Sequence, residues 1–239
     1  MKHRINKINS KASDDTRDDS HEIMKAFGLE EEVQMRKIGL YGELDGDKAE
    51  VVVYSLLHLH ETRMKNIPRP LTVAQRKKIE KASKSVEQKS VETIEIKFDE
   101  VAQPIDFIIS TPGGRACDMF SIYDTMRLVR KDCDIVTFGL GQVMSAGTLI
   151  MASGTKGKRK IGKNCRVMVH QVSAGTSGPH HEMINEIAEI EYTQAQYIKC
   201  LAAETKMSET FIRKLFEKKV NVYMSAEEAV KNGLADIIV

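Results

Sequence analysis

The sequence predicts an α/β protein whose mainly parallel sheet is covered by helices. Between Ile105 and about Thr205, short apolar runs typical of strands alternate with longer runs typical of helices. Such alternation indicates βαβ-like units, in which successive strands lie parallel. The apolar run Ile105–Ile109 also leads into the tight turn Pro112-Gly113-Gly114, as expected at the carboxyl end of a strand. The 239 residues suffice for one compact domain with extensions.

The chain begins with a segment that is too polar to form part of a core. Residues 1–34 are mixed in charge and poor in apolar side chains, so we expect a flexible extension before a folded domain at 35–239. Lys37–Gly42 is expected to form a short strand that ends at a glycine. Ala49–Glu61 carries apolar side chains at helical spacing and is expected to form a helix.

A charged stretch at about 62–103 interrupts the domain. Pro68 and Pro70 break the preceding helix. Thr72–Gln88 is rich in Lys, Glu, Gln and Ala with a thin apolar stripe, which favours an exposed helix. Thr93–Phe98 alternates apolar and polar residues, as an edge or half-buried strand does. The excess of Lys and Arg in this stretch is interpreted as a solvated face rather than a binding patch.

The remaining elements follow from the same patterns. Strands are expected at Phe107–Ser110, Ile135–Phe138 and Cys165–His170. Helices are expected at Met119–Arg130, Ser145–Ala152 and from Glu182 to about Thr205.

Composition argues against several classes of function. Hydrophobic residues make up 41% of the chain and aromatic residues 5%, with no Trp, so the core is expected to be aliphatic. A net charge of +2 gives no case for a nucleic-acid partner. The 4 cysteines are scattered without a CxxC pair or a His/Cys cluster, which indicates buried thiols in a reducing compartment and no metal site. His180 and His181 point to different sides of a helix and are interpreted as solvated.

Nothing in the sequence predicts a membrane or secretory protein. No apolar run reaches the length of a membrane span, and the N-terminus lacks the apolar region of a signal peptide. The aspartates at Asp14, Asp15, Asp18 and Asp19 argue against an organellar transit peptide. We therefore expect a soluble, cytoplasmic protein.

Ser145 and His170 carry the chemistry that decides the functional prediction. Ser145 lies between small residues at the start of an apolar helical run, where free backbone N–H groups favour a developing oxyanion. His170 lies 25 positions later (170 − 145) and closes the apolar strand Arg166–Val169. A serine nucleophile needs a base held this rigidly. Each residue alone is more often structural, and no spacing rule places the two in contact.

Gly113 and Gly114 supply a second feature. Two adjacent glycines leave their backbone amides unshielded by a Cβ, so the N–H of Gly114 can approach an anion closely. The alternative is a plain strand-to-helix turn, which is the more frequent meaning of a lone Pro-Gly-Gly.

Together these features closely resemble the proteolytic subunit of the Clp protease (ClpP). The resemblance covers Arg36–Val239 with its motifs in family order, apart from one insertion, the charged stretch at about 62–103. The matching stretches are Thr111–Gly114, Ser121–Met126, Gly141–Gly147, Gly154–Arg159, Asn164–Gln171, Met224–Ala229 and Gly233–Asp236.

The resemblance implies a fold and a mechanism. The fold would be the ClpP/crotonase-like fold of ββα repeats, in which the helix from Glu182 is a protruding handle that interleaves with a second ring. Ser145 would attack the peptide carbonyl, and His170 would take its proton and deliver it to the leaving amine. The backbone N–H groups of Gly114 and Ala146 would form the oxyanion hole.

The third catalytic position departs from the family pattern. Relatives usually carry aspartate four residues before the serine of the Met-Ser-Ala-Glu-Glu-Ala stretch, and here that position holds Asn221. Its carbonyl oxygen can accept the Nδ1–H of His170, but it cannot stabilise an imidazolium with a full negative charge. Asp236 and Glu217 are alternatives that do not align with the triad. The favoured interpretation is a Ser-His-Asn triad of reduced or assembly-dependent activity.

The resemblance also implies partners. Subunits would associate into heptameric rings, stacked as a tetradecamer, and cleave unfolded polypeptides in the enclosed chamber. No cofactor is expected in this subunit, because ATP is consumed by a separate AAA+ unfoldase. Relatives present aromatic residues to that unfoldase at positions that hold Asp106 and Ile108 here, with Leu128 at a further cleft position. These changes argue against docking to a standard unfoldase, and a ClpP paralogue is the alternative partner.

Other functions compete with the peptidase hypothesis. A catalytically weak or inactive ring subunit that modulates an active paralogue accounts for Asn221, Asp106 and the insertion. A crotonase-type acyl-CoA enzyme uses paired backbone amides and accounts for Gly114, but it gives no role to Ser145 and His170. A Ser-Lys peptidase is disfavoured because His170 stands where a triad base is expected.

Overall fold

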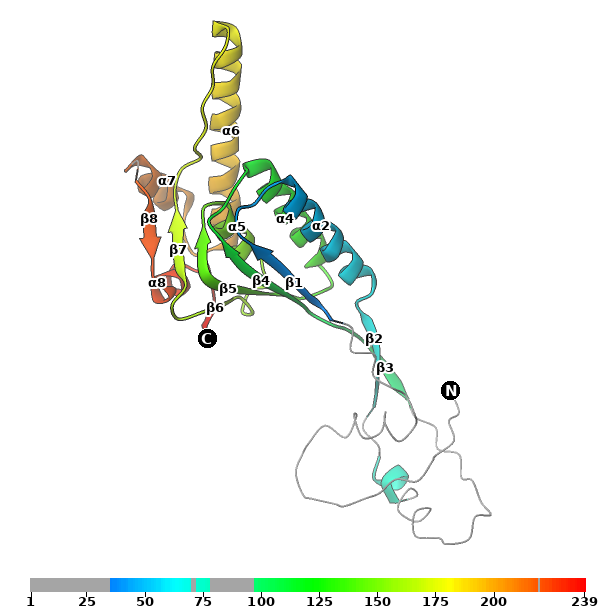
Figure 1. Ribbon diagram of the computed structural model, residues 1–239. Coiled ribbons are helices and arrows are strands. Elements are labelled where there is room, and N and C mark those ends of the chain that lie inside the picture. Colours follow the sequence, from blue (N-terminus) through cyan, green and yellow to red (C-terminus); the bar gives the residue numbers. More distant parts are fainter. Residues whose placement is uncertain (1–34, 70–71, 78–96, 219) are drawn as a thin grey trace. The chain divides into compact units, whose positions relative to one another are not determined.

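The computed structural model of the protein describes residues 35–69, 72–77, 97–218 and 220–239 (Figure 1). The chain divides into two compact units, one made of Met1–Met35 with Met64–Ala102 and the other of Arg36–Arg63 with Gln103–Val239. The expected extension at 1–34 lies outside the described residues. Residues 73–77 of the expected helix at 72–88 are helical, and most of the expected strand at 93–98 is not described.

The described part of the first unit contains a two-stranded antiparallel ribbon. β2 (Met64–Pro68) pairs with β3 (Phe98–Ala102). Arg69, directly after β2, forms an ion pair with Asp99 at 2.6 Å. The sequence patterns do not predict β2, because Pro68 indicates only a break. A proline is tolerated there because it is the last residue of the strand in a two-stranded ribbon, where few backbone donors need partners.

The second unit is built on a seven-stranded, mainly parallel sheet (Figure 1). Its main path runs in the order β1, β4, β5, β6, β9, and every pair on this path is parallel. These strands are β1 (Lys37–Tyr41), β4 (Ile105–Thr111), β5 (Ile135–Met144), β6 (Lys160–Ile161) and β9 (Ile237–Ile238). The α/β fold class with a parallel-dominated sheet is therefore confirmed.

β5 is longer than the sequence predicts, and the sheet branches at it. The apolar pattern ends at Phe138, but the strand continues to Met144 because, after a register shift, β4 and the strand at Arg166–Val169 supply partners for its last residues. The last residues of β5 pair in parallel with β7 (Arg166–Val169), and β8 (Val222–Met224) pairs with β7 in the antiparallel direction. This branch brings the carboxyl ends of β5 and β7 to the same edge of the sheet.

Helices cover the sheet and enclose an aliphatic core. α2 (Gly46–Glu61) packs against α4 (Ala116–Val129), and α5 (Ala146–Ala152) follows β5 directly. The Asp45 side chain caps α2 by accepting the N–H of Lys48 at 2.9 Å, which satisfies one of the free donors of the first turn. The apolar residues of α2 that are buried recur at helical spacing: Ala49, Val52, Leu56 and Leu59.

α6 (His180–Glu204) is a single helix of 25 residues that projects from the sheet (Figure 1). Its last turn is anchored, because the buried Glu204 pairs with Arg130 at 2.8 Å and accepts the Tyr123 hydroxyl at 3.2 Å. Its first half is exposed and includes the apolar side chains of Ile184, Ile187 and Tyr192. This is the arrangement expected for the handle helix.

Two short helices complete the fold. α7 (Glu209–Glu217) and α8 (Ala226–Lys231) are preceded by Ser208 and Ser225, whose hydroxyls cap the helices by accepting backbone N–H groups of the first turn. Ser225 and Glu228 form a reciprocal capping box. Among the described residues, no helix combines the length and apolar character needed to cross a membrane.

Candidate active site

Ser145 lies at the junction of β5 and α5 in a backbone conformation that few residues adopt. Its φ of 53° and ψ of −123° make it the only described residue other than glycine with a positive φ. Such a conformation costs about 1–3 kcal/mol and persists where the surroundings enforce it. The Ser145 N–H donates to the Met168 carbonyl at 2.8 Å, and the Ser145 carbonyl accepts the Thr148 N–H at 3.0 Å. Main-chain bonds on both sides therefore hold the sharp turn.

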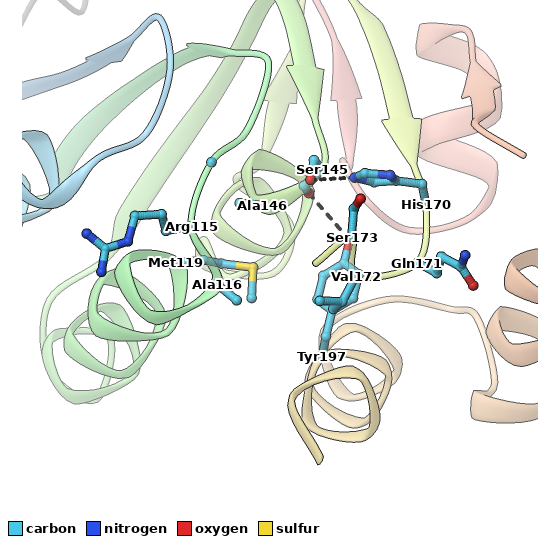
Figure 2. Close-up of a pocket in the computed structure, with 11 residues that line it drawn as sticks. Arg115, Ala116, Met119, Ser145, Ala146, His170, Gln171, Val172, Ser173 and Tyr197 are labelled. Atoms are coloured by element: carbon cyan, nitrogen blue, oxygen red, sulfur yellow. Dashed lines mark hydrogen bonds between the residues drawn. The ribbon is translucent and has the colours of Figure 1, made fainter. Parts of the chain in front are cut away.

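His170 directly follows β7 and contacts Ser145. Met144 pairs with Met168 in the β5–β7 ladder, so the two strand ends carry both side chains to one edge of the sheet. His170 Nε2 and Ser145 Oγ lie 2.7 Å apart (Figure 2). Burial lowers the pKa of His170 below its ordinary value of 6.5. The neutral imidazole, the form that accepts a serine proton, is therefore favoured at neutral pH.

Gly113 and Gly114 bring the backbone after β4 close to Ser145. A Cβ on Gly113 would lie 2.5 Å from the Ser145 Cβ, and one on Gly114 would lie 1.9 Å from the Leu44 carbonyl oxygen. Gly113 also has a φ of 106°, which favours glycine. Neither the Gly114 N–H nor the Ala146 N–H donates to an acceptor within the part of the chain that is described. Two backbone donors are thus left free for an oxyanion.

Asn221 is not bonded to His170 in the structure. It is exposed, lies one residue before β8, and forms no hydrogen bond with any described residue. The β7–β8 ladder ends at the pair Val169–Val222, so His170 and Asn221 are the next residues of the two strands. Directly opposed residues of an antiparallel ladder have Cβ atoms about 4.5–5.5 Å apart on the same face. The ladder stops one pair short of that contact.

The two other acids considered from the sequence lie in other environments. Asp236 accepts hydrogen bonds from Nε and Nη2 of Arg159 at 2.8 and 2.6 Å, and from the N–H of Gly157 at 2.7 Å. It therefore holds the C-terminal segment to the turn before β6. Glu217 is exposed at the end of α7. Neither carboxylate is hydrogen-bonded to His170.

A cavity of about 200 Å³ opens beside Ser145. Its walls are residues 114–116, 145–146 and 170–173, together with Met119 and Tyr197 (Figure 2). Residue patterns do not indicate a role for Met119 or Tyr197, because each reaches the site through helix packing and no local spacing rule relates either to Ser145. In the described ranges, no group of three or more His, Cys, Asp or Glu side chains is placed to hold a metal ion.

Comparison with known proteins places these features in a family. The Clp protease family model matches residues 72–239. The ATP-dependent Clp protease proteolytic subunit 3 of Frankia casuarinae is 37% identical over 135 residues, which cover 56% of this chain and 62% of that protein. This chain therefore spans less than two thirds of the Frankia protein.

Two further relatives give the same result. The ATP-dependent Clp protease proteolytic subunit 2 of Chlamydia trachomatis serovar D is 34% identical over 142 residues, covering 59% of this chain and 68% of that protein. The ATP-dependent Clp protease proteolytic subunit 4 of Rhodococcus jostii is 32% identical over 146 residues, covering 61% of this chain and 73% of that protein.

A serine bonded to a histidine at the edge of a parallel sheet, beside free backbone amides, is an arrangement that nucleophilic hydrolases use. The family model matches well over half of the chain. The protein belongs to the Clp protease family.

Proposed function

We propose that this protein is a serine endopeptidase of the Clp protease type, in which Ser145 is the nucleophile and His170 the general base. The observation that carries the proposal is the 2.7 Å contact between Ser145 Oγ and His170 Nε2. Membership of the Clp protease family and the strained turn at Ser145 support it. Strain of this kind is typical of a serine held out toward a substrate.

The proposed reaction is an acyl transfer. Ser145 Oγ attacks the scissile carbonyl carbon while its proton moves to His170 Nε2. The carbonyl oxygen becomes an oxyanion that accepts the N–H groups of Gly114 and Ala146. His170 then donates its proton to the leaving amine, which departs as the carbon–nitrogen bond breaks and leaves an acyl-enzyme. Water, deprotonated by His170, attacks the ester carbon. The bond from that carbon to Ser145 Oγ then breaks, the product leaves with a new carboxyl terminus, and Ser145 Oγ recovers the proton from His170. No metal or small-molecule cofactor enters any of these steps.

Self-association is the second part of the proposal. The exposed half of α6 includes Ile184 at 52%, Ile187 at 49% and Tyr192 at 60% exposure. An apolar face on a projecting helix is normally covered by another surface. We assign it to a second copy of this chain in a stacked ring, so that unfolded polypeptides are cleaved inside a chamber. The proposed further partner is either a separate ATP-consuming unfoldase that delivers these polypeptides or a ClpP paralogue that assembles with this subunit.

Asn221 is proposed as the third member of the triad in the assembled ring. One further pair in the β7–β8 ladder would set Asn221 opposite His170, where its amide oxygen would accept the Nδ1–H. The isolated chain lacks that pair, which also motivates a second candidate function. In that alternative, the protein is a catalytically weak or inactive ring subunit that modulates an active paralogue.

A fluorophosphonate probe on the purified full-length protein tests the peptidase proposal. We expect covalent labelling at Ser145, located by peptide mass spectrometry, together with cleavage of a fluorogenic peptide. S145A should lose both activities and keep the wild-type particle size. Intact wild-type particles that neither become labelled nor cleave peptide would overturn the peptidase and leave the modulating subunit as the better account. Native mass spectrometry after co-expression with a conventional homologue would then show whether mixed rings form.

A further inference from the structure

Tyr197 places a buried hydroxyl next to the backbone carbonyl of the proposed nucleophile. This residue of α6 is 4% exposed, and its ring stacks on Phe216 of α7 with centroids 6.0 Å apart. Its hydroxyl lies 2.8 Å from Thr148 Oγ1 and 3.4 Å from the Ser145 carbonyl oxygen. Figure 2 draws this last contact as a dashed line from Ser145 to the Tyr197 hydroxyl, beside the line that joins Ser145 to His170. Packing fixes the apolar ring, and the polar tip reaches the active-site backbone.

The hydrogen bonds form a relay that ends on the Ser145 carbonyl. Thr148 Oγ1 donates to that oxygen at 2.6 Å, which uses the single proton of the Thr148 hydroxyl. Tyr197 is therefore the donor in its 2.8 Å contact with Thr148. Burial raises the pKa of Tyr197 to about 12, so this donor keeps its proton at neutral pH. With the Thr148 N–H at 3.0 Å, the carbonyl oxygen is surrounded by donors.

The Ser145 carbonyl and the Ala146 N–H belong to the same peptide unit. In a planar trans peptide these two groups point in opposite directions. Donors that fix the oxygen therefore direct the Ala146 N–H the opposite way, and Ala146 lines the cavity beside Ser145. Hydrogen bonds accepted by a peptide carbonyl also polarise the unit and strengthen its N–H as a donor.

We infer that Thr148 and Tyr197 are positioning residues of the oxyanion hole, which orient and polarise the Ser145–Ala146 peptide. The inference rests on the proposed function, because it requires the Ala146 N–H to receive the oxyanion. It adds two residues that touch no reacting atom and that come from different helices. Their effect should appear in the transition state, where charge develops on the substrate oxygen, and not in substrate binding.

Variants that preserve shape separate this role from packing. T148V keeps the volume of the side chain and removes the hydroxyl, whereas T148S keeps the hydroxyl. Y197F keeps the ring that stacks on Phe216 and removes only the oxygen. The substitutions are made in the full-length protein, and active sites are counted by fluorophosphonate titration, so that rates refer to correctly folded sites.

The measurements are kcat and KM for a fluorogenic peptide, and the Ki of two inhibitors of the same peptide sequence. One inhibitor is an aldehyde, whose adduct with serine places an oxyanion in the hole, and the other is an unreactive amide. We expect T148V to lower kcat about tenfold and to raise the Ki of the aldehyde by a similar factor. KM and the Ki of the amide should not change. Y197F should lower kcat about threefold, and T148S should recover most of the loss seen in T148V.

Each outcome decides the inference. If T148V and Y197F match wild type per active site in kcat and in aldehyde affinity, the positioning role is wrong while the peptidase stands. If they lower thermal stability and site count but leave per-site kcat unchanged, the residues only support packing, which also overturns it. If T148V does not fold, the same comparison with Y197F decides. Wild-type protein that shows no labelling at Ser145 would refute the proposed function, and this inference would fall with it.

Discussion

The two ends of the parallel sheet in the second unit differ in whether their backbone polar groups are hydrogen-bonded. At the carboxyl end, Ser145 and Gly113 adopt positive φ, and the N–H groups of Gly114 and Ala146 are free of acceptors within the described chain. At the amino end, the buried side chain of Arg36 donates to carbonyl oxygens. These belong to Leu59, Thr62, Gln103 and Pro104, at distances of 2.7 to 3.2 Å.

The difference indicates that the reactive groups lie at the carboxyl end of the sheet, whereas the amino end can tolerate changes in chain length. Unpaired donors and strained backbone cost stability, and they are useful only where a substrate can occupy them. At the opposite end, the Gln103 N–H donates to the Arg63 carbonyl at 2.8 Å. Because these two residues are held together, a longer segment between them costs little additional closure entropy.

The largest effect is expected from adding a methyl group at the carboxyl end. In G114A the new Cβ would meet the Leu44 carbonyl oxygen at 1.9 Å, so the backbone must shift and carry its N–H away from the oxyanion position. Loss of one such donor costs about 2.7–4 kcal/mol of transition-state stabilisation. We therefore expect fluorophosphonate labelling of Ser145 to slow by about 10²–10³-fold. Labelling rates are measured at equal concentrations of folded protein.

G46A is the matched control for G114A. Gly46 is the first residue of α2, and a Cβ there meets nothing within 4 Å. Its labelling rate should equal that of wild type, since the same change in mass and backbone entropy occurs far from the oxyanion hole. A G114A protein that is labelled as fast as G46A would remove Gly114 from the proposed oxyanion hole.

The next effect tests the opposite end of the sheet. R36M keeps most of the side-chain volume and removes the guanidinium, so the buried contact with the Leu59 carbonyl and the part-buried contacts with three other carbonyl groups are lost. Such groups cost about 1–3 kcal/mol when left unsatisfied. We expect the free energy of unfolding, measured by urea denaturation, to fall by about 2 kcal/mol. Because Arg36 lies away from the strand ends that carry the site, the labelling rate of the folded protein should not change.

K37M separates burial from charge in that experiment. Lys37 is the neighbouring residue, it carries the same charge, and its side chain is exposed on β1. Its substitution should change the unfolding free energy by less than about 0.5 kcal/mol. Equal losses in R36M and K37M would show that the carbonyl contacts of Arg36 do not stabilise the fold.

The same contrast explains how far the sequence could predict the molecule. Local patterns predict the strand end before His170, the helix start at Ser145 and the glycine turn at Gly114. Their joint role as a site comes from the resemblance to the Clp protease family, because no spacing rule places Ser145 and His170 in contact. Tyr197 and Thr148 escape such analysis, since their contact exists only after α6 packs on α5. The position of Asn221 depends on where a two-strand ladder stops, which no residue pattern specifies. β2 is not predicted, because its last residue, Pro68, indicates only a break in the preceding helix.

A smaller effect is expected from restoring a carboxylate beside the base. N221D would place a negative charge one pair beyond the end of the β7–β8 ladder, where it would stabilise the imidazolium of His170. We expect kcat for a fluorogenic peptide to rise about tenfold. This gain is below the roughly 10⁴ known for the reverse change in a preorganised triad, because the ladder must first extend.

V220D controls for charge alone in the experiment on Asn221. Val220 is exposed and adjacent, and one further pair of the β7–β8 ladder would set position 221, not position 220, opposite His170. Its kcat should stay near that of wild type. If N221D and V220D behave alike, Asn221 has no place in the triad, and the weakly active ring subunit becomes the better account.

The smallest expected effect is a shift of the pH profile. Burial lowers the pKa of His170 below 6.5, so its neutral form persists as the solution is acidified. Labelling of Ser145 requires that form, and the acid limb of the rate should therefore have its midpoint below pH 6.5. In N221D the carboxylate would favour the imidazolium and move this midpoint upward. Both midpoints are obtained from the rate of labelling measured between about pH 5 and pH 8, the range in which histidine titrates. Circular dichroism at each pH confirms that the protein is folded. A wild-type midpoint above 6.5 would mean that a negative group already acts on His170 in the assembled protein.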